Sequence, residues 1–112
     1  MTNPVIYFEI AGPDPQELRD FYGDLFGWEI DEIKDGYAPI AAGGPEGIKG
    51  GVLQTPEPRV TVYVDVDDLR TALDRAVELV GSVLMPWTDY GEVLIAQIAD
   101  PAGNLIGLSQ HR

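Results

Sequence analysis

The chain has 112 residues with no cysteine, and its 19 acidic and 7 basic residues give a formal net charge of −12. This charge argues against binding to nucleic acid or to an anionic membrane surface, whose phosphates would be repelled. Without cysteine there can be no disulfide, thiolate zinc site or cysteine nucleophile, so any metal would need His, Asp or Glu ligands. The one histidine, His111, is expected at the surface and not in a metal site.

The first half begins with a predicted strand and helix. Residues 4–10 alternate and are rich in β-branched and aromatic types, which favours a strand. Asp14 followed by Pro15 is typical of a helix start, and Gly27 of a helix end. Between them, apolar residues recur at helical spacing: Leu18, Phe21, Tyr22, Leu25 and Phe26.

Three short strands are predicted after this helix, at residues 28–33, 37–42 and 48–53. Glycine-containing turns separate them, which indicates a meander. Residues 55–58 contain two prolines and cannot continue a central strand, because proline lacks the backbone donor. They predict a linker between the two halves of the chain.

The second half repeats this order of elements. Residues 59–66 predict a strand, Asp67 or Asp68 caps a helix, and Gly81 ends it. The apolar positions of this helix are Leu69, Ala72, Leu73, Ala76 and Val80. The last three predicted strands are residues 82–85, 92–99 and 105–110.

The two halves align at an offset of 54 positions, which places Tyr7 on Thr61, Phe26 on Val80 and Gly27 on Gly81. We therefore predict an α+β fold of one domain, residues 1–112, built from two βαβββ modules at about residues 4–55 and 59–110. Their curved mixed sheets would surround a cleft. A ferredoxin-like βαββαβ fold is the competing architecture, but it has fewer strands than the sequence predicts.

Strand alternation assigns side chains to the two faces of the first strand. Ile6, Phe8 and Ile10 would pack beneath the helix, and Tyr7 and Glu9 would face the cleft. A carboxylate in an apolar cavity can act as a base, so Glu9 is a candidate catalytic residue. The plainer alternative is that Glu9 is a solvated acid near the end of a strand.

Several segments together resemble the vicinal-oxygen-chelate superfamily, which includes glyoxalases and bleomycin-resistance proteins. They are residues 5–10, 14–15, 21–28, 63–69 and 98–104. The similarity covers nearly the whole chain and implies the same two-module fold. It also implies a homodimer and a small-molecule ligand in the cleft.

The resemblance further implies where a metal would be held in this superfamily. The expected ligand positions fall on Tyr7, Thr61 and Gly107, where the family has imidazole or carboxylate groups. A phenol, a hydroxyl and a hydrogen are poor replacements. We therefore expect no metal and no other cofactor.

The remaining candidates for ligand binding are Tyr63, which shares a face with Thr61, together with Gln97 and Trp87. Strand parity assigns Gln97 to the cavity, together with three further side chains, Val52, Gln54 and Ile95. Trp87 is placed in a loop at the cavity mouth, where Asp89 and Glu92 would suit a cationic aromatic ligand. Packing of Trp87 at an edge is the alternative.

The leading hypothesis is a metal-free, homodimeric, cytoplasmic binder of a small organic molecule. No apolar run is long enough to span a bilayer, and the N-terminal residues lack the features of a signal peptide. One alternative is a lyase or an oxidoreductase, including a dioxygenase, that acts on a small carbonyl or diol compound. Another is a regulatory or partner-binding module.

Overall fold

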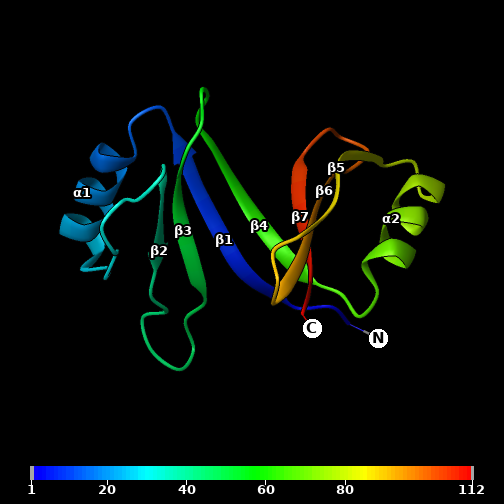
Figure 1. The fold of residues 1–112 in the computed structure, drawn as a ribbon, viewed down its shortest axis with the longest axis horizontal. Coiled ribbons are helices and arrows are strands. Elements are labelled where there is room, and N and C mark those ends of the chain that lie inside the picture. Colours follow the sequence, from blue (N-terminus) through cyan, green and yellow to red (C-terminus); the bar gives the residue numbers. More distant parts are fainter. Residues whose placement is uncertain (1, 112) are drawn as a thin grey trace. The chain divides into compact units, whose positions relative to one another are not determined.

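The computed structural model describes residues 2–111, which contain seven strands and two helices (Figure 1). In chain order these are β1 (Val5–Gly12), α1 (Pro15–Phe26), β2 (Tyr37–Ile40), β3 (Lys49–Gln54), β4 (Arg59–Asp65), α2 (Leu69–Glu78), β5 (Ser82–Asp89), β6 (Val93–Ala99) and β7 (Leu105–His111). The α+β class predicted from the sequence is confirmed. The chain forms two compact units, residues 7–61 and residues 2–6 with 62–111.

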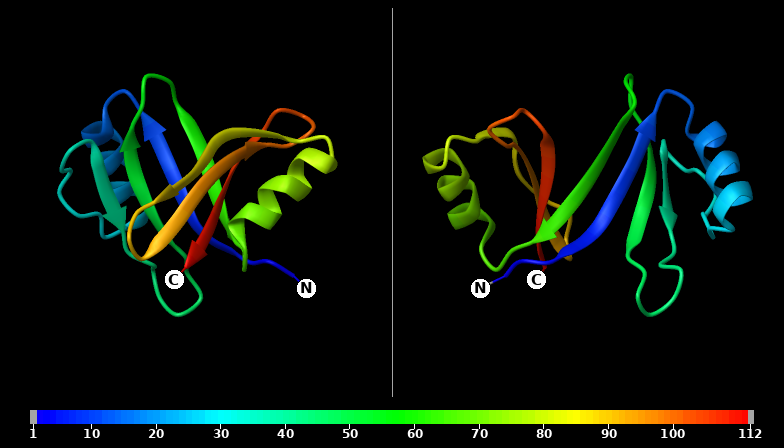
Figure 2. Two further views of the ribbon diagram at one scale, coloured as in Figure 1. Left: turned by 45° about the vertical axis from the view of Figure 1, so that its right-hand side comes forward. Right: turned by 180° about the vertical axis from the view of Figure 1, so that it is seen from behind.

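In residues 7–61 the strand order is β2-β3-β1, with β1 parallel and β2 antiparallel to β3. Helix α1 lies along one side of these strands (Figure 2). Leu18 and Tyr22 of α1 pack with Phe8 of β1 against a core that includes the buried Val52. Phe8 therefore lies beneath the helix, as strand alternation predicts.

Both ends of α1 follow the sequence signals. The Glu17 backbone amide donates to the Asp14 carboxylate at 3.2 Å, so Asp14 is the N-cap. Gly27 takes a left-handed conformation with φ 69°, and its amide donates to the carbonyl of Gly23 at 2.9 Å. Glycine adopts this conformation without steric cost, which explains why the helix ends there.

The strand predicted at residues 28–33 is wrong. Only isolated bridges form in this region, Ile30 with Ile40 and Lys34 with Tyr37. The Nε of Arg19 donates to the carbonyl oxygens of Ile30 at 3.1 Å and Asp31 at 2.8 Å. Those two carbonyls therefore bind a side chain of α1. Residues 28–33 form a connection that is held to this helix, and not a strand.

In the other unit, the strand order within residues 62–111 is β4-β7-β6-β5. β4 is parallel to β7, and β6 is antiparallel to both of its neighbours. Leu69 and Leu73 of α2 pack against Ala96 and Leu108 on one side of this sheet. The predicted order of a strand, a helix and three strands is confirmed here.

None of the helices in residues 2–111 is long and apolar enough to cross a membrane.

The N-terminus of α2 repeats that of α1. The Thr71 amide donates to the Asp68 carboxylate at 3.2 Å, and Asp68 lies 54 positions after Asp14. The C-terminus differs from the prediction, because Val80, and not Gly81, is left-handed, with φ 73°. The Gly81 amide then donates back to the carbonyl of Ala76 at 2.8 Å.

Strand β5 is longer and less regular than predicted. Met85 pairs with Gln97 and Thr88 pairs with Ile95, so β5 carries one extra residue between these pairs. This is a β-bulge, which accommodates Pro86 in an outer strand. Trp87 consequently lies within a strand, and its predicted position in a loop is wrong.

Candidate functional site

A row of three predicted residues crosses the sheet of residues 62–111. Gly107 pairs with Tyr63 on β4 and with Gln97 on β6. The Gln97 amide donates to the Tyr63 hydroxyl at 3.3 Å. Tyr63 is buried and Gln97 is half-buried. Alternation turns this Tyr63–Gln97 row away from α2, because the neighbouring Val64, Ala96 and Leu108 pack beneath that helix.

The next row on the same face contains an unpredicted polar cluster. The Asp65 carboxylate accepts from the Ser109 hydroxyl at 3.4 Å, and the same oxygen lies 2.9 Å from Nδ1 of His111. The His111 side chain is 55% exposed, as expected for a surface residue. The carboxylate can orient the imidazole, but the Ser109 hydroxyl is bound to Asp65, so this is not an activated serine nucleophile.

The predicted residues of β1 lie in the other unit. The hydroxyl groups of Tyr7 and Tyr37 form a hydrogen bond. Tyr37 is a site residue that the sequence analysis missed, and burial raises the pKa of its phenol above 10.0. Its ring covers Gly51, the register partner of Glu9. An aromatic residue near a run of glycines is the signal that could have identified this contact.

Thr61 is the most buried of the predicted polar residues, with 1% of its surface exposed. Within residues 2–111 its hydroxyl has no hydrogen-bond partner. A buried hydroxyl without a hydrogen-bond partner is energetically unfavourable. A ligand that formed a hydrogen bond with the Thr61 hydroxyl would therefore bind more tightly.

Two of the residues assigned to the cavity by parity, Val52 and Gln54, lie on β3. Val52 is fully buried in the core beneath α1, so its assignment was wrong by one residue. The Gln54 side chain is exposed and donates to the carbonyl of Pro13 at 3.3 Å. Ile95 does share the face of Gln97, since the two are separated by one residue on β6.

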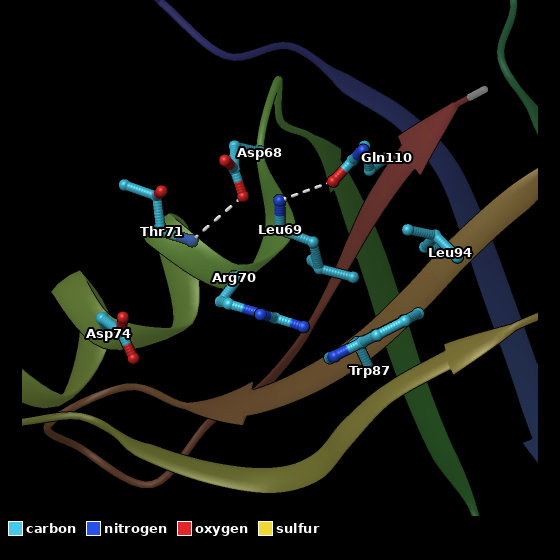
Figure 3. Close-up of a pocket in the computed structure, with 8 residues that line it drawn as sticks. All are labelled: Asp68, Leu69, Arg70, Thr71, Asp74, Trp87, Leu94 and Gln110. Atoms are coloured by element: carbon cyan, nitrogen blue, oxygen red, sulfur yellow. Dashed lines mark hydrogen bonds between the residues drawn. The ribbon is translucent and has the colours of Figure 1, made fainter.

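Trp87 lines a pocket of about 360 Å³ next to α2 (Figure 3). This Trp87 pocket is formed by Asp68, Leu69, Arg70, Thr71, Asp74, Trp87, Leu94 and Gln110. The acidic neighbours are therefore Asp68 and Asp74, and not the predicted Asp89 and Glu92. Leu94 packs with the core beneath α2, so the pocket opens on the opposite side of the sheet from Gln97.

The family model described as "Glyoxalase-like domain" matches residues 7–109. The chain belongs to this family. Two mycobacterial proteins named "Putative glyoxylase CFP32", from Mycobacterium bovis and Mycobacterium tuberculosis, are each 28% identical over 93% of this glyoxalase-like chain. The match covers 44% of each relative, so the chain spans less than half of their length.

Solved structures have the same fold as this glyoxalase-like protein. A glyoxalase/bleomycin resistance protein/dioxygenase superfamily member from Vibrio splendidus has a TM-score of 0.70 at 17% identity, covering 97% of this chain and 99% of that one. A Mn(II)-bound glyoxalase from Novosphingobium aromaticivorans has a TM-score of 0.69 at 20% identity. That match covers 97% of this chain and 40% of the other.

The residues present do not fit the metal that the superfamily resemblance implies. At Gly107, the Tyr63 ring fills the space that a side chain would need. The other two positions carry a buried hydroxyl, Thr61, and a phenol, Tyr7, already bonded to Tyr37. Within residues 2–111 no three His, Asp or Glu side chains converge as metal ligands. The residues at these three positions therefore do not supply the donor set that a divalent ion requires.

Proposed function

We propose that this glyoxalase-like protein binds a small organic molecule without a metal ion and that the Tyr63–Gln97 row contacts the ligand. The observation that supports this most directly is the Tyr63 ring over Gly107, with its hydroxyl bonded to Gln97. An aromatic ring and an amide offer stacking and hydrogen bonds, which suit an organic ligand better than a cation such as Mn(II).

Gln97 is the residue of the row best placed for contact. Its side chain is half-buried, and its amide carries a second N–H and a carbonyl besides the bond to Tyr63. In the other unit, Tyr7, Glu9 and Thr61 remain predicted ligand-binding residues. Thr61 has the strongest support among them, because its buried hydroxyl has no protein partner within residues 2–111.

A thermal-shift screen over aromatic acids, α-ketoaldehyde adducts and cationic antibiotics tests the proposal. A ligand at a hundred times its Kd stabilises the folded state by about 2.7 kcal/mol. Gln97→Leu should weaken binding at least tenfold, and Gln16→Leu, an exposed change on α1, should not. Equal binding by both variants would reject the role of Gln97. One equivalent of tightly held metal per chain in the purified protein would reject metal-free binding.

A second candidate is an enzyme acting on a small carbonyl compound. The supporting observation is the Asp65–His111 pair, because a carboxylate that orients an imidazole can make it an effective base. Deuterium exchange next to the carbonyl of a bound ketoaldehyde adduct would measure this activity. Exchange that His111→Gln abolishes would favour the enzyme, whereas exchange unchanged in this variant would remove His111 from the mechanism.

The homodimer and the cytoplasmic location also stay proposals. Strand β2 is already bridged on its outer side, where Ile30 pairs with Ile40 and Lys34 with Tyr37. Strand β5 has one side without a neighbouring strand among the described residues, but Pro86 limits pairing of that edge with a second chain. A dimer would therefore use another surface. Light scattering coupled to size exclusion measures the state, and a monomer at micromolar concentration would reject the dimer.

A further inference from the structure

We propose that the Trp87 pocket is a binding site for small organic cations, independent of the Tyr63–Gln97 row. Trp87 is a large aromatic residue that remains 41% exposed. The pocket beside it, about 360 Å³, lies at the lower end of the range typical of small-molecule sites. It combines an apolar floor, an aromatic wall and two carboxylates.

The direction of the Trp87 side chain results from the irregularity of β5. Between the pairs Met85–Gln97 and Thr88–Ile95, β5 has two residues where β6 has only Ala96. Bulges of this kind redirect a side chain. Here the bulge places Trp87 on the side of Ala96, which faces α2, so that its ring forms a wall of the pocket.

The charges around the pocket favour a cation over an anion. Among residues 2–111, Asp68 and Asp74 contribute two carboxylates to the pocket, and Arg70 is the one cationic side chain that lines it. Two of the amides in the first turn of α2, which would attract an anion, already have side-chain acceptors. The Leu69 amide donates to the Gln110 side chain at 2.7 Å, and the Thr71 amide donates to Asp68 at 3.2 Å. The net charge of −12 also concentrates cations near the protein.

Arg70 shows how a cation would be held. Its guanidinium carbon lies 5.8 Å from the centre of the Trp87 ring, a cation–π arrangement. In Figure 3 the two side chains point toward each other, and Asp74 lies on the next turn of the helix. Arg70 is exposed, on a flexible side chain, so a ligand ammonium can take its place over the ring.

The test uses benzyltrimethylammonium as the probe, with benzyl alcohol and benzoate as its neutral and anionic counterparts. Binding is followed by the indole N–H NMR signal of Trp87, and that of Trp28 in the other unit serves as an internal reference. The cation should shift the Trp87 signal in a saturable way. The alcohol should bind about 5- to 30-fold more weakly, because it lacks the cation–π attraction. Benzoate should not bind.

Variants distinguish the cation site from general hydrophobic binding. Arg70→Gln removes the internal competitor and should tighten cation binding, whereas Arg75→Gln, a matched change elsewhere on α2, should leave it unchanged. Asp74→Asn should weaken it. Calorimetry replaces the lost NMR signal for Trp87→Leu, which should bind about 5- to 30-fold more weakly than the parent protein. Circular dichroism confirms that each variant is folded.

Three results would overturn the proposal. The first is saturable binding of benzoate that Arg70→Gln abolishes, because it would make the pocket an anion site. The second is equal binding of the ammonium and the alcohol. The third is cation binding that persists at full affinity in folded Trp87→Leu.

Discussion

The ring of Tyr63 on β4 covers Gly107, its register partner on β7. The same arrangement occurs in the other unit, where Phe8 covers its partner Gly50. An aromatic ring that packs over a glycine fills the space left by the missing side chain and stabilises the pair of strands. At Gly107 this packing also excludes the carboxylate that the superfamily pattern places there. A side chain at position 107 and the Tyr63 ring in its present place therefore exclude each other.

Gly107→Ala should destabilise the protein by about 1–3 kcal/mol, because the added methyl group would collide with the Tyr63 ring. Urea unfolding measures the change. Gly43→Ala is the matched control, since no atom lies within 4 Å of a methyl group built there. In a Tyr63→Ala background the Gly107→Ala cost should nearly vanish. If Gly107→Ala lowered the unfolding free energy of the Tyr63→Ala protein by the same amount, the Tyr63 ring would not be the cause.

Val80→Gly should stabilise the protein by about 0.5–1 kcal/mol. The left-handed φ of 73° is sterically unfavourable for a β-branched residue, whereas glycine adopts it without strain. Val80 is 79% exposed, so little burial is lost. Thermal unfolding should show a higher Tm. The control is Val77→Gly inside α2, where glycine should destabilise by about 0.5–1 kcal/mol. Destabilisation by both changes would contradict strain at Val80.

The sequence predicts the parts of this fold that depend on local signals. The caps Asp14 and Asp68 and the stop at Gly27 act within a few residues, so pattern alone locates them. The strand expected at residues 28–33 is reduced to one bridge, Ile30 with Ile40, because Pro39 has no amide hydrogen to donate to the Asp31 carbonyl. That carbonyl binds the side chain of Arg19 instead, twelve residues earlier in the chain. Such a contact leaves no mark in the local periodicity.

The same distinction applies to the candidate site. Alternation assigns Tyr63 and Gln97 to the cleft separately, and their hydrogen bond shows that the two side chains share one face of the sheet. It fails for Trp87, because a bulge adds one residue to β5 and Pro86 resembles the end of a strand. Tyr37 and Asp65 are missed for another reason: their partners Tyr7 and His111 lie 30 and 46 residues away.

Tyr37 should make the protein sensitive to alkali. Burial raises the pKa of its phenol above 10.0, so the folded state retains the proton while the unfolded chain loses it. Its contribution to stability is complete below the unfolded pKa and is lost as pH rises through the folded value. Tyr37→Phe should flatten the fall of unfolding free energy above about pH 10. An unchanged slope would show that this phenol is not responsible.

Asp100 should make the turn before β7 sensitive to acid. Its carboxylate accepts hydrogen bonds from the Asn104 side chain at 3.0 Å and from the backbone amides of Asn104 and Ala102, each at 2.9 Å. The bonds from Asn104 are the main reason that the pKa of Asp100 lies below 3.8. A lowered pKa stabilises the turn above the unfolded value, and this stabilisation is lost as pH falls through the folded one. Protection of the Asn104 amide from hydrogen exchange is its measured rate compared with the intrinsic rate of an unstructured peptide at the same pH. This protection should be greater at about pH 6 than well below pH 3.8. Asp100→Ala should reduce the protection at both values, and equal protection in the variant and the parent protein would contradict the role of this carboxylate.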